Sequence, residues 1–304
     1  ISAKTDSNPI QGTFSVSLYG LFELTKPRLS LMSVFTASLG FLVHFPLVQD
    51  FYIFFSLTIG TAFAAAGAAA LNQWMERDED SLMPRTAKRP IPAKIIDPEI
   101  ALAFGVCLSS LGLAILWVGT NPWACSLTLL TLFVYLLVYT PLKKRTPYAT
   151  EAGAISGALP PLIGWVAASG VPSVYGWILF GILFAWQLPH FMAIAWNFRS
   201  DYQQGGFKLH SLGKSDGFHL ARKSLIYSFI LSGLIFSPYF FETGQPVPGI
   251  LYLLSACFLT LYLMIPSFQF FTSPNRDKPA KKLFFVTIIY LPLLFATLVI
   301  DRFL

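Results

Sequence analysis

Long apolar runs alternate with short polar segments along almost the whole chain. A helix needs about 20 mostly apolar residues to cross the hydrocarbon core of a bilayer. Runs of this kind cover residues 29–48, 51–74, 98–118, 123–140, 150–169, 173–196, 224–241, 247–266 and 284–301. The pattern predicts an all-α, polytopic integral membrane protein with about nine transmembrane helices. All of it, from residue 1 to residue 304, is expected to form a single membrane domain.

The positive charges occupy alternate connections between these runs. Lys and Arg lie in the N-terminal segment 1–28, in the connections 75–97 and 197–223, and after the fourth and eighth runs. The intervening turns have none, and Arg302 alone of the 21 Lys and Arg residues lies on the other side. Because Lys and Arg near span ends stay in the cytoplasm, the N-terminus and both long loops are predicted to face the cytoplasm or the mitochondrial matrix. Chemistry is expected on this charged face.

Composition agrees with the membrane prediction and removes several other classes. Only 12% of the residues are charged and 55% are hydrophobic, whereas soluble domains carry about 25% charged residues. The three cysteines lie inside apolar runs without the spacing of a disulfide framework or zinc site. The net charge of +6 could indicate a nucleic-acid partner, but its one-sided placement reports topology instead, so none is expected.

The first polar constellation lies where the second run ends. Asn72, Glu76 and Asp80 are spaced four residues apart, which places them on one face of a continuing helix. Neighbouring acids repel one another unless a cation neutralises them, and oxygen ligands of this kind suit Mg²⁺ shared with substrate phosphates. These three residues are the candidate metal ligands. The alternative is a solvated acidic helix end.

Basic residues follow the acidic constellation closely. Arg85 and Arg89 come directly after it, and Lys143 and Lys144 form a basic hinge between the fourth and fifth runs. Arg gives two-pronged hydrogen bonds to phosphate, so these cations could clamp an anionic substrate that the metal also touches. The alternative is simple anchoring of helix ends on the charged side.

A second constellation lies at the end of the sixth run. Its members are Gln187, His190, Asn197, Arg199, Asp201 and Tyr202. One narrow helical stripe contains four of them, Gln187, His190, Asn197 and Asp201. Such a polar stripe should face a cavity instead of lipid. The spacing from Asn197 to Asp201 also echoes that from Asn72 to Glu76 and hints at two acidic loops facing each other. A lone histidine here could equally be a packing residue.

Two such clusters at the end of an apolar bundle fit metal–diphosphate binding. An apolar cavity below them would accept a prenyl chain, and Mg²⁺ with Arg and Lys would stabilise the departing diphosphate while an acceptor captures the carbocation. A site shielded by the bilayer would protect that cation from water.

The motifs at these positions resemble those of the UbiA-type intramembrane prenyltransferases. Besides Asn72 to Asp80, the resemblance rests on 24–28, 83–90, 139–147, 157–165, 186–191 and 199–202 with Gly205 and Gly206. It runs in order from about residue 24 to 212. The sequences Trp186-Gln-Leu-Pro-His-Phe and Arg199-Ser-Asp-Tyr resemble the haem-farnesylating branch of the family in particular.

The resemblance implies a nine-span helical bundle that joins farnesyl diphosphate and protohaem IX, with haem as substrate and Mg²⁺ as cofactor. It implies that Asn72, Glu76 and Asp80 hold the metal–diphosphate, with Arg85, Arg89 and Lys144 on the phosphates. His190, Arg199, Asp201 and Tyr202 would line the second half of the site. Glu76 departs from the Asp common in the family, and Ser200 replaces an acid, which weakens the second cluster as a direct metal site.

Two other functions compete with this one. A prenyltransferase for an aromatic quinone precursor would share the first motif, and a transporter or non-catalytic subunit would use the polar stripe as a pathway. A haem A synthase is a candidate partner beside the lipid bilayer itself. Because no basic, Ser/Arg-rich presequence is evident, we expect a bacterial plasma membrane, with the mitochondrial inner membrane as the alternative.

Overall fold

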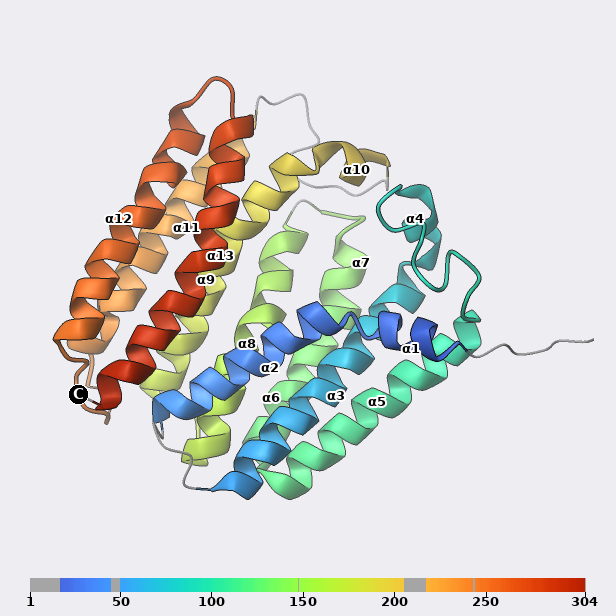
Figure 1. Cartoon of the computed structure of the whole chain (residues 1–304), viewed down its shortest axis with the longest axis horizontal. Coiled ribbons are helices and arrows are strands. Elements are labelled where there is room, and N and C mark those ends of the chain that lie inside the picture. Colours follow the sequence, from blue (N-terminus) through green and yellow to red (C-terminus); the bar gives the residue numbers. More distant parts are fainter. Residues whose placement is uncertain (1–16, 45–49, 147, 205–216, 243, 304) are drawn as a thin grey trace, which may run out of the picture.

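The computed structural model describes residues 17–44, 50–146, 148–204, 217–242 and 244–303, and every regular element in these ranges is a helix (Figure 1). The elements are α1 (Leu18–Leu24), α2 (Pro27–His44), α3 (Phe51–Met75), α4 (Arg77–Leu82), α5 (Pro98–Gly119), α6 (Pro122–Phe133), η1 (Val134–Tyr139), α7 (Thr140–Leu142), α8 (Ala149–Ser169), α9 (Val174–Asn197), α10 (Arg199–Gln204), α11 (Phe218–Phe236), η3 (Ser237–Tyr239), α12 (Ile250–Thr272), α13 (Asp277–Ile300) and η4 (Asp301–Phe303). The predicted all-α class is confirmed.

The helices correspond closely to the predicted spans. Among the described residues, eight helical stretches are long and apolar enough to cross a membrane, namely α3, α5, α6 through α7, α8, α9, α11 with η3, α12 and α13. They match the second to ninth predicted spans. The predicted first span is α2, an 18-residue helix that packs against α3 and α8 but begins with polar residues. The short helix α1 was not expected in the polar N-terminal segment.

The surface of the bundle is apolar, as a bilayer requires. On α12, for example, Leu254, Phe258, Leu261 and Ile265 all point outward and are more than half exposed. Small and polar residues occupy the interior between the helices, among them Thr61, Ser156 and Gln187. Lipid tails are as apolar as leucine, so burying large apolar side chains between helices gives no advantage over exposing them to lipid. The helices associate through close packing of their backbones instead.

Glycines allow that close packing between α2 and α8. A Cβ atom on Gly40 would lie 2.0 Å from the carbonyl oxygen of Pro161, and one on Gly164 would lie 1.8 Å from that of Ala37. The two backbones therefore touch directly, and only glycine fits at either contact. The small stretch of α3 around Gly67 packs in the same way against Ser109 of α5.

Three interruptions of the spanning helices lie near one end of the bundle. The helix α3 stops at Met75 and restarts as α4, the chain between α6 and α7 forms the π-helix η1, and α9 stops at Asn197 before α10. Figure 1 shows α4, α7 and α10 grouped at this end. Such π-helical turns are frequent at functional sites, and this end of the bundle carries both predicted constellations.

Candidate functional site

The first constellation is buried at the junction of α3 and α4. Glu76 leaves the helical conformation, with φ −100° and ψ 11°, so the predicted single helix is broken there. The spacing nevertheless survives, because the Glu76 N–H donates to the carbonyl of Asn72 and the Asp80 N–H donates to that of Glu76. The exposed fractions are only 1% for Asn72, 4% for Glu76 and 1% for Asp80. The alternative of a solvated acidic helix end is therefore wrong.

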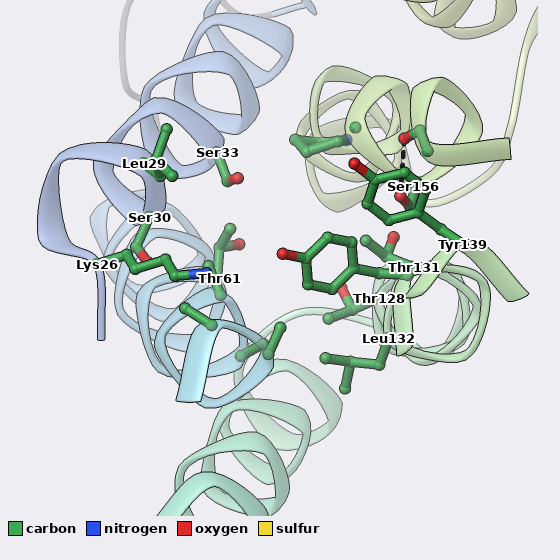
Figure 2. Close-up of a pocket in the computed structure, with 18 of the residues that line it drawn as sticks. Lys26, Leu29, Ser30, Ser33, Thr61, Thr128, Thr131, Leu132, Tyr139 and Ser156 are labelled. Atoms are coloured by element: carbon green, nitrogen blue, oxygen red, sulfur yellow. Dashed lines mark hydrogen bonds between the residues drawn. The ribbon is translucent and has the colours of Figure 1, made fainter. Parts of the chain in front are cut away.

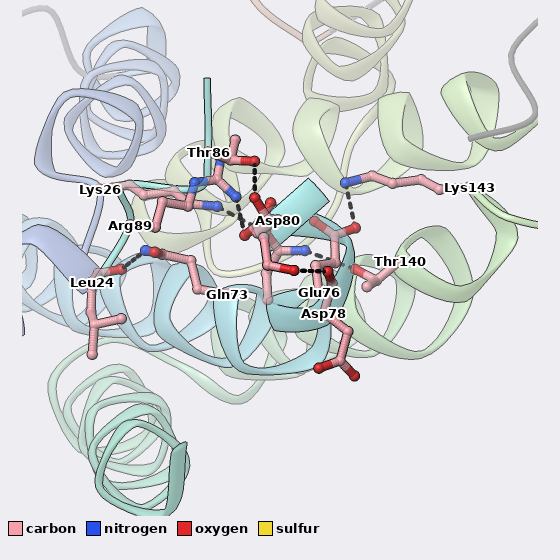
Figure 3. A network of polar contacts seen from close by, with 12 residues as sticks. Leu24, Lys26, Gln73, Glu76, Asp78, Asp80, Thr86, Arg89, Thr140 and Lys143 are labelled. Atoms are coloured by element: carbon pink, nitrogen blue, oxygen red, sulfur yellow. Dashed lines mark hydrogen bonds and ion pairs between the residues drawn. The ribbon is translucent and has the colours of Figure 1, made fainter. Parts of the chain in front are cut away.

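Each of these three side chains meets a cation from a different segment. The Lys26 ammonium donates to Asn72 Oδ1 over 2.8 Å, and the Lys143 ammonium donates to Glu76 Oε1 over 2.8 Å. The Arg89 guanidinium donates to Asp80 Oδ2 over 2.5 Å. Figure 3 shows Arg89 directed at Asp80 and Lys143 directed at Glu76, with Lys26 beside Arg89. The cluster thus joins the start of α2, the loop after α4 and the end of α7.

The positive charges of the cluster influence one another. Burial and the neighbouring Arg89 lower the pKa of the Lys26 ammonium to about 7. Burial by itself would lower the pKa of Lys143, but Tyr139 and the Glu76 carboxylate outweigh it and hold that pKa above its ordinary value. An anion bound beside Lys26, whose side-chain partner is the neutral amide of Asn72, would stabilise its charged form.

The carboxylates retain oxygens that could bind a metal. Asp80 Oδ1 and Glu79 Oε2 are buried and have no hydrogen-bond partner among the described residues. Within the same ranges, no three His, Cys, Asp or Glu side chains lie close enough to hold a metal ion by themselves. This donor set fits Mg²⁺, which usually binds one or two carboxylates and completes its octahedron with substrate phosphates and water.

The π-helix η1 supplies the wall beside this cluster. Thr140 Oγ1 donates to the carbonyl of Tyr135 and accepts a hydrogen bond of 3.2 Å from Asn72 Nδ2. The Asn72 amide is thus fixed on both sides, by Lys26 and by Thr140. Within η1 the rings of Tyr135 and Tyr139 stack with centroids 5.7 Å apart. Both tyrosines of η1 line the cavity, and the residues that follow η1 place Lys143 in contact with Glu76.

A largely apolar cavity of about 320 Å³ lies beneath the cluster. It is enclosed by α2, α3, α6, η1, α8 and α9, and Lys26 forms part of its lining. Figure 2 shows Lys26 reaching in from one wall while Thr128, Thr131 and Tyr139 form the opposite wall. Its volume lies in the range of small-molecule sites. A ligand with a charged head and an apolar tail could occupy the cluster and the cavity together.

The second constellation is divided between two places. Gln187 lines the cavity, whereas His190 faces α13, where its Nδ1 lies 2.9 Å from Thr287 Oγ1. Asn197 is the last residue of α9 and is half-buried. The prediction of a single polar stripe is therefore wrong. The helix α9 ends before Asp201, and His190 and Gln187 point to different neighbours, α13 and the cavity.

The residues of α10 also take separate partners. Arg199 pairs with Asp277 of α13 at 3.2 Å and lies over the ring of Trp196. Asp201 lies 3.9 Å from Arg85, whose guanidinium also lies 6.0 Å from the centre of the Tyr202 ring. Burial raises the pKa of the Tyr202 hydroxyl. Arg85 therefore connects the loop after α4 with α10, as the idea of two facing loops predicts.

The other predicted residues lie at the edge of the first cluster or outside the described residues. Lys144 pairs with Glu79 at the edge of the first cluster. Gly205 and Gly206 lie outside the described residues. The sequence motifs include Lys26, Tyr139 and Thr140, but none of the three was predicted as a site residue. The sequence does contain an indication for Lys26. It is a charged residue directly at the start of the first span, where burying a charge is costly and often serves a function.

Comparison with known proteins agrees with this geometry. Residues 33–289 match the model of the UbiA prenyltransferase family. The chain is 42% identical over 280 residues to a protein of Opitutus terrae named protoheme IX farnesyltransferase, covering 92% of this chain and 93% of that protein. It is 36% identical over 289 residues to the protein of that name from Solibacter usitatus, covering 92% and 97%.

Solved structures share the fold at low sequence identity. A digeranylgeranylglyceryl phosphate synthase superposes with a TM-score of 0.79 at 17% identity, covering 93% of this chain and 98% of that one. A UbiA homologue from Archaeoglobus fulgidus, bound to GPP and Mg²⁺, superposes with a TM-score of 0.61 at 13% identity over 92% of this chain and 99% of that one. These likenesses show the fold of the bundle.

Proposed function

The chain belongs to the UbiA prenyltransferase family, and we propose that it transfers the farnesyl group of farnesyl diphosphate to a vinyl group of protohaem IX. The observation that carries this proposal is the buried cluster of Asn72, Glu76 and Asp80 against three cations, directly above an apolar cavity. The name shared by its relatives in Opitutus terrae and Solibacter usitatus supports the choice of substrates.

The diphosphate would bind at the cluster and the farnesyl chain in the cavity. Asn72, Glu76 and Asp80 would hold Mg²⁺, as the free oxygen of Asp80 allows. The UbiA homologue with bound GPP and Mg²⁺ supports this assignment by analogy of fold. When bound, Mg²⁺ neutralises charge on the leaving diphosphate. Arg85, Arg89 and Lys144 would contact the phosphates, together with Lys26 and Lys143.

The chain's own residues would then control the reaction at the cavity mouth. The C–O bond to the diphosphate breaks, the farnesyl carbon bonds to the terminal vinyl carbon, and water adds to the adjacent carbon with loss of a proton. Lys26 and Arg89 would stabilise the charge that develops on the departing oxygen. Tyr135, Tyr139 and the apolar walls would keep water away from the allylic cation.

The test is a reaction with purified protein in lipid nanodiscs. We expect farnesyl diphosphate and haem to give a hydroxyfarnesylated haem by mass spectrometry, with Mg²⁺ required and EDTA abolishing the product. Prenylation of 4-hydroxybenzoate alone would replace the proposal with the quinone-precursor reaction. Release of no diphosphate under any of these conditions would reject an enzyme of this kind and favour a transporter.

We further place the protein in a bacterial plasma membrane with its N-terminus in the cytoplasm. The bacterial relatives and the one-sided distribution of Lys and Arg support this assignment. A haem A synthase is the partner we propose, since a farnesylated haem is more apolar than its precursor and would pass between enzymes within the membrane. The variants Lys94→Cys and Val171→Cys check the orientation. In intact cells an impermeant thiol reagent should label the cysteine at 171, on the outer face, and not the cysteine at 94.

A further inference from the structure

His190 lies outside the diphosphate site and is held in a defined position. Its ring stacks with Trp186 of its own helix and with Phe284 of α13, at centroid distances of 5.3 and 5.2 Å and interplanar angles of 14° and 21°. Two nearly parallel stacking partners restrain the plane of the imidazole. The ring also adjoins Phe191, at a centroid distance of 5.9 Å, and Phe191 lines the cavity. His190 thus faces α13, while its neighbour Phe191 reaches the cavity.

Thr287 fixes the rotation of the ring and the position of its proton. This threonine is fully buried, and its hydroxyl donates to carbonyl oxygens of its own helix, those of Leu283 and Phe284. A hydroxyl has only one proton, so the 2.9 Å contact with the ring is donated by the Nδ1–H of His190. The neutral imidazole then carries its lone pair on Nε2. The indole of Trp186 donates to the Thr287 carbonyl over 2.8 Å and locks the same crossing of helices.

The lone pair on Nε2 accepts no hydrogen bond from the part of the chain that the structure describes. Nε2 is also not among the buried polar atoms that are sealed off without a partner. It is therefore accessible from outside the packed core. A histidine that donates one ring N–H to a fixed acceptor and presents the other nitrogen is the usual arrangement of a metal-ligating histidine. It is also the usual axial ligand of haem iron.

We propose that Nε2 of His190 is the axial ligand of the iron in the haem substrate, with Thr287 as the residue that sets its tautomer and orientation. This inference rests on the proposed function, because it needs haem as the acceptor. Iron ligation would fix one point of the macrocycle beside the cavity that holds the farnesyl chain. The flat rings of Phe191 and Phe284 would offer apolar walls to the porphyrin. His190 would thus be a positioning residue for the acceptor, separate from the diphosphate cluster.

The experiment compares haemin with metal-free protoporphyrin IX as probes. His190→Phe keeps an aromatic ring beside Trp186 and Phe284 but has no nitrogen, so folding should be preserved. We expect the wild type to bind haemin with the absorption and EPR signals of nitrogen ligation. In His190→Phe these signals should disappear and the Kd for haemin should rise at least about tenfold. The Kd for protoporphyrin IX, which has no iron, should change by less than about twofold.

Two further variants separate ligation from packing. His190→Gly should regain the nitrogen-ligated spectrum when free imidazole is added, which a purely structural role would not produce. Thr287→Val keeps the shape of the side chain but removes the acceptor, and should weaken haemin binding by a smaller factor. His44→Phe is the matched control, because His44 also packs against an aromatic ring, that of Trp165 at a centroid distance of 4.7 Å, and ends α2. It should leave the haemin spectrum unchanged.

The outcomes distinguish this inference from the proposed function. If the wild type farnesylates haem but His190→Phe keeps its spectrum and its affinity for haemin, the ligand assignment is overturned while the function stands. Loss of the spectrum in His44→Phe instead would also overturn it. If the wild type neither binds nor farnesylates haem, the proposed function fails, and the assignment fails with it.

Discussion

The two polar constellations begin with the same spacing and end in different structures. Asn72 and Glu76 stay together with Asp80 because each meets a cation, from the start of α2, the end of α7 and the loop after α4. Asp201, in contrast, meets a single cation, Arg85, in a partly exposed pair separated by 3.9 Å. The other residues of this constellation point in different directions. Gln187 lines the cavity, His190 contacts Thr287 of α13, and Arg199 pairs with Asp277.

The difference fits the two separate binding roles that we propose for the two constellations. Concentrated, buried charge suits a small, highly charged ligand such as a metal–diphosphate. Dispersed polar groups among aromatic rings suit a large, flat and mostly apolar acceptor. A repeated sequence spacing therefore does not by itself predict a repeated function. Mutations in the first cluster should disturb diphosphate chemistry, and those in the second should disturb the acceptor.

The largest effect is expected at Asp80. Asp80→Asn keeps the size of the side chain but removes the charge that faces Arg89 and the free oxygen that could bind Mg²⁺. We expect kcat to fall at least about a hundredfold, measured as farnesylated haem formed by purified protein. Asp78→Asn is the matched control, because Asp78 is an exposed acid of the same helix. Similar losses in both variants would contradict a specific role of Asp80.

A smaller effect is expected at Lys26, which belongs to both the cluster and the cavity. Lys26→Met keeps the length of the side chain but removes a buried charge next to the proposed diphosphate. We expect kcat/KM for farnesyl diphosphate to fall by about ten- to a hundredfold, with Lys26→Arg recovering part of the loss. The exposed Lys88→Met serves as control. An unchanged kcat/KM in Lys26→Met would show that the cation serves packing alone.

The connection between Arg85 and Asp201 should matter less. The pair is partly exposed and separated by 3.9 Å, so its direct energy is small. Arg85→Ala and Asp201→Asn should each lower kcat/KM about fivefold, and the double variant should lose about as much as either single one. Losses that multiply in the double variant would show that the two loops act independently. The four proteins are compared at equal haem and varied farnesyl diphosphate.

The fold and the first cluster were largely predictable from the sequence, for a physical reason. Spanning helices must satisfy their backbone hydrogen bonds internally, so apolar runs determine where helices lie. The acids at Glu76 and Asp80 stood out because charge is costly at that depth. The arrangement across helices was less accessible. Neither the π-helix η1 nor the pairing of Lys26 with Asn72, 46 residues apart, leaves a local pattern in the sequence.

The second cluster was predicted in membership but not in geometry. A helical wheel places Gln187 and His190 close together, yet 60° of rotation is enough to give them different neighbours. His190 meets Thr287, which is 97 residues away in the sequence, and no periodicity within α9 reveals that partner. The end of α9 at Asn197 then separates Asp201 from the stripe. Tertiary contacts, not helix period, decide which polar residues share a site.

The smallest effect is expected where the two regions meet, at Gly157 of α8. A Cβ atom added there would lie 2.2 Å from Oε1 of Gln187. Because that oxygen is the far end of a flexible side chain, the amide can move into the cavity while the backbone stays in place. Gly157→Ala should therefore leave the melting temperature nearly unchanged but raise KM for farnesyl diphosphate about two- to threefold. Gly233→Ala is the control for a glycine-to-alanine substitution in a helix, because no atom lies within 4 Å of the added carbon. If instead KM for haem rises and that for farnesyl diphosphate does not, Gln187 belongs with the acceptor, and the boundary between the two regions lies inside the cavity.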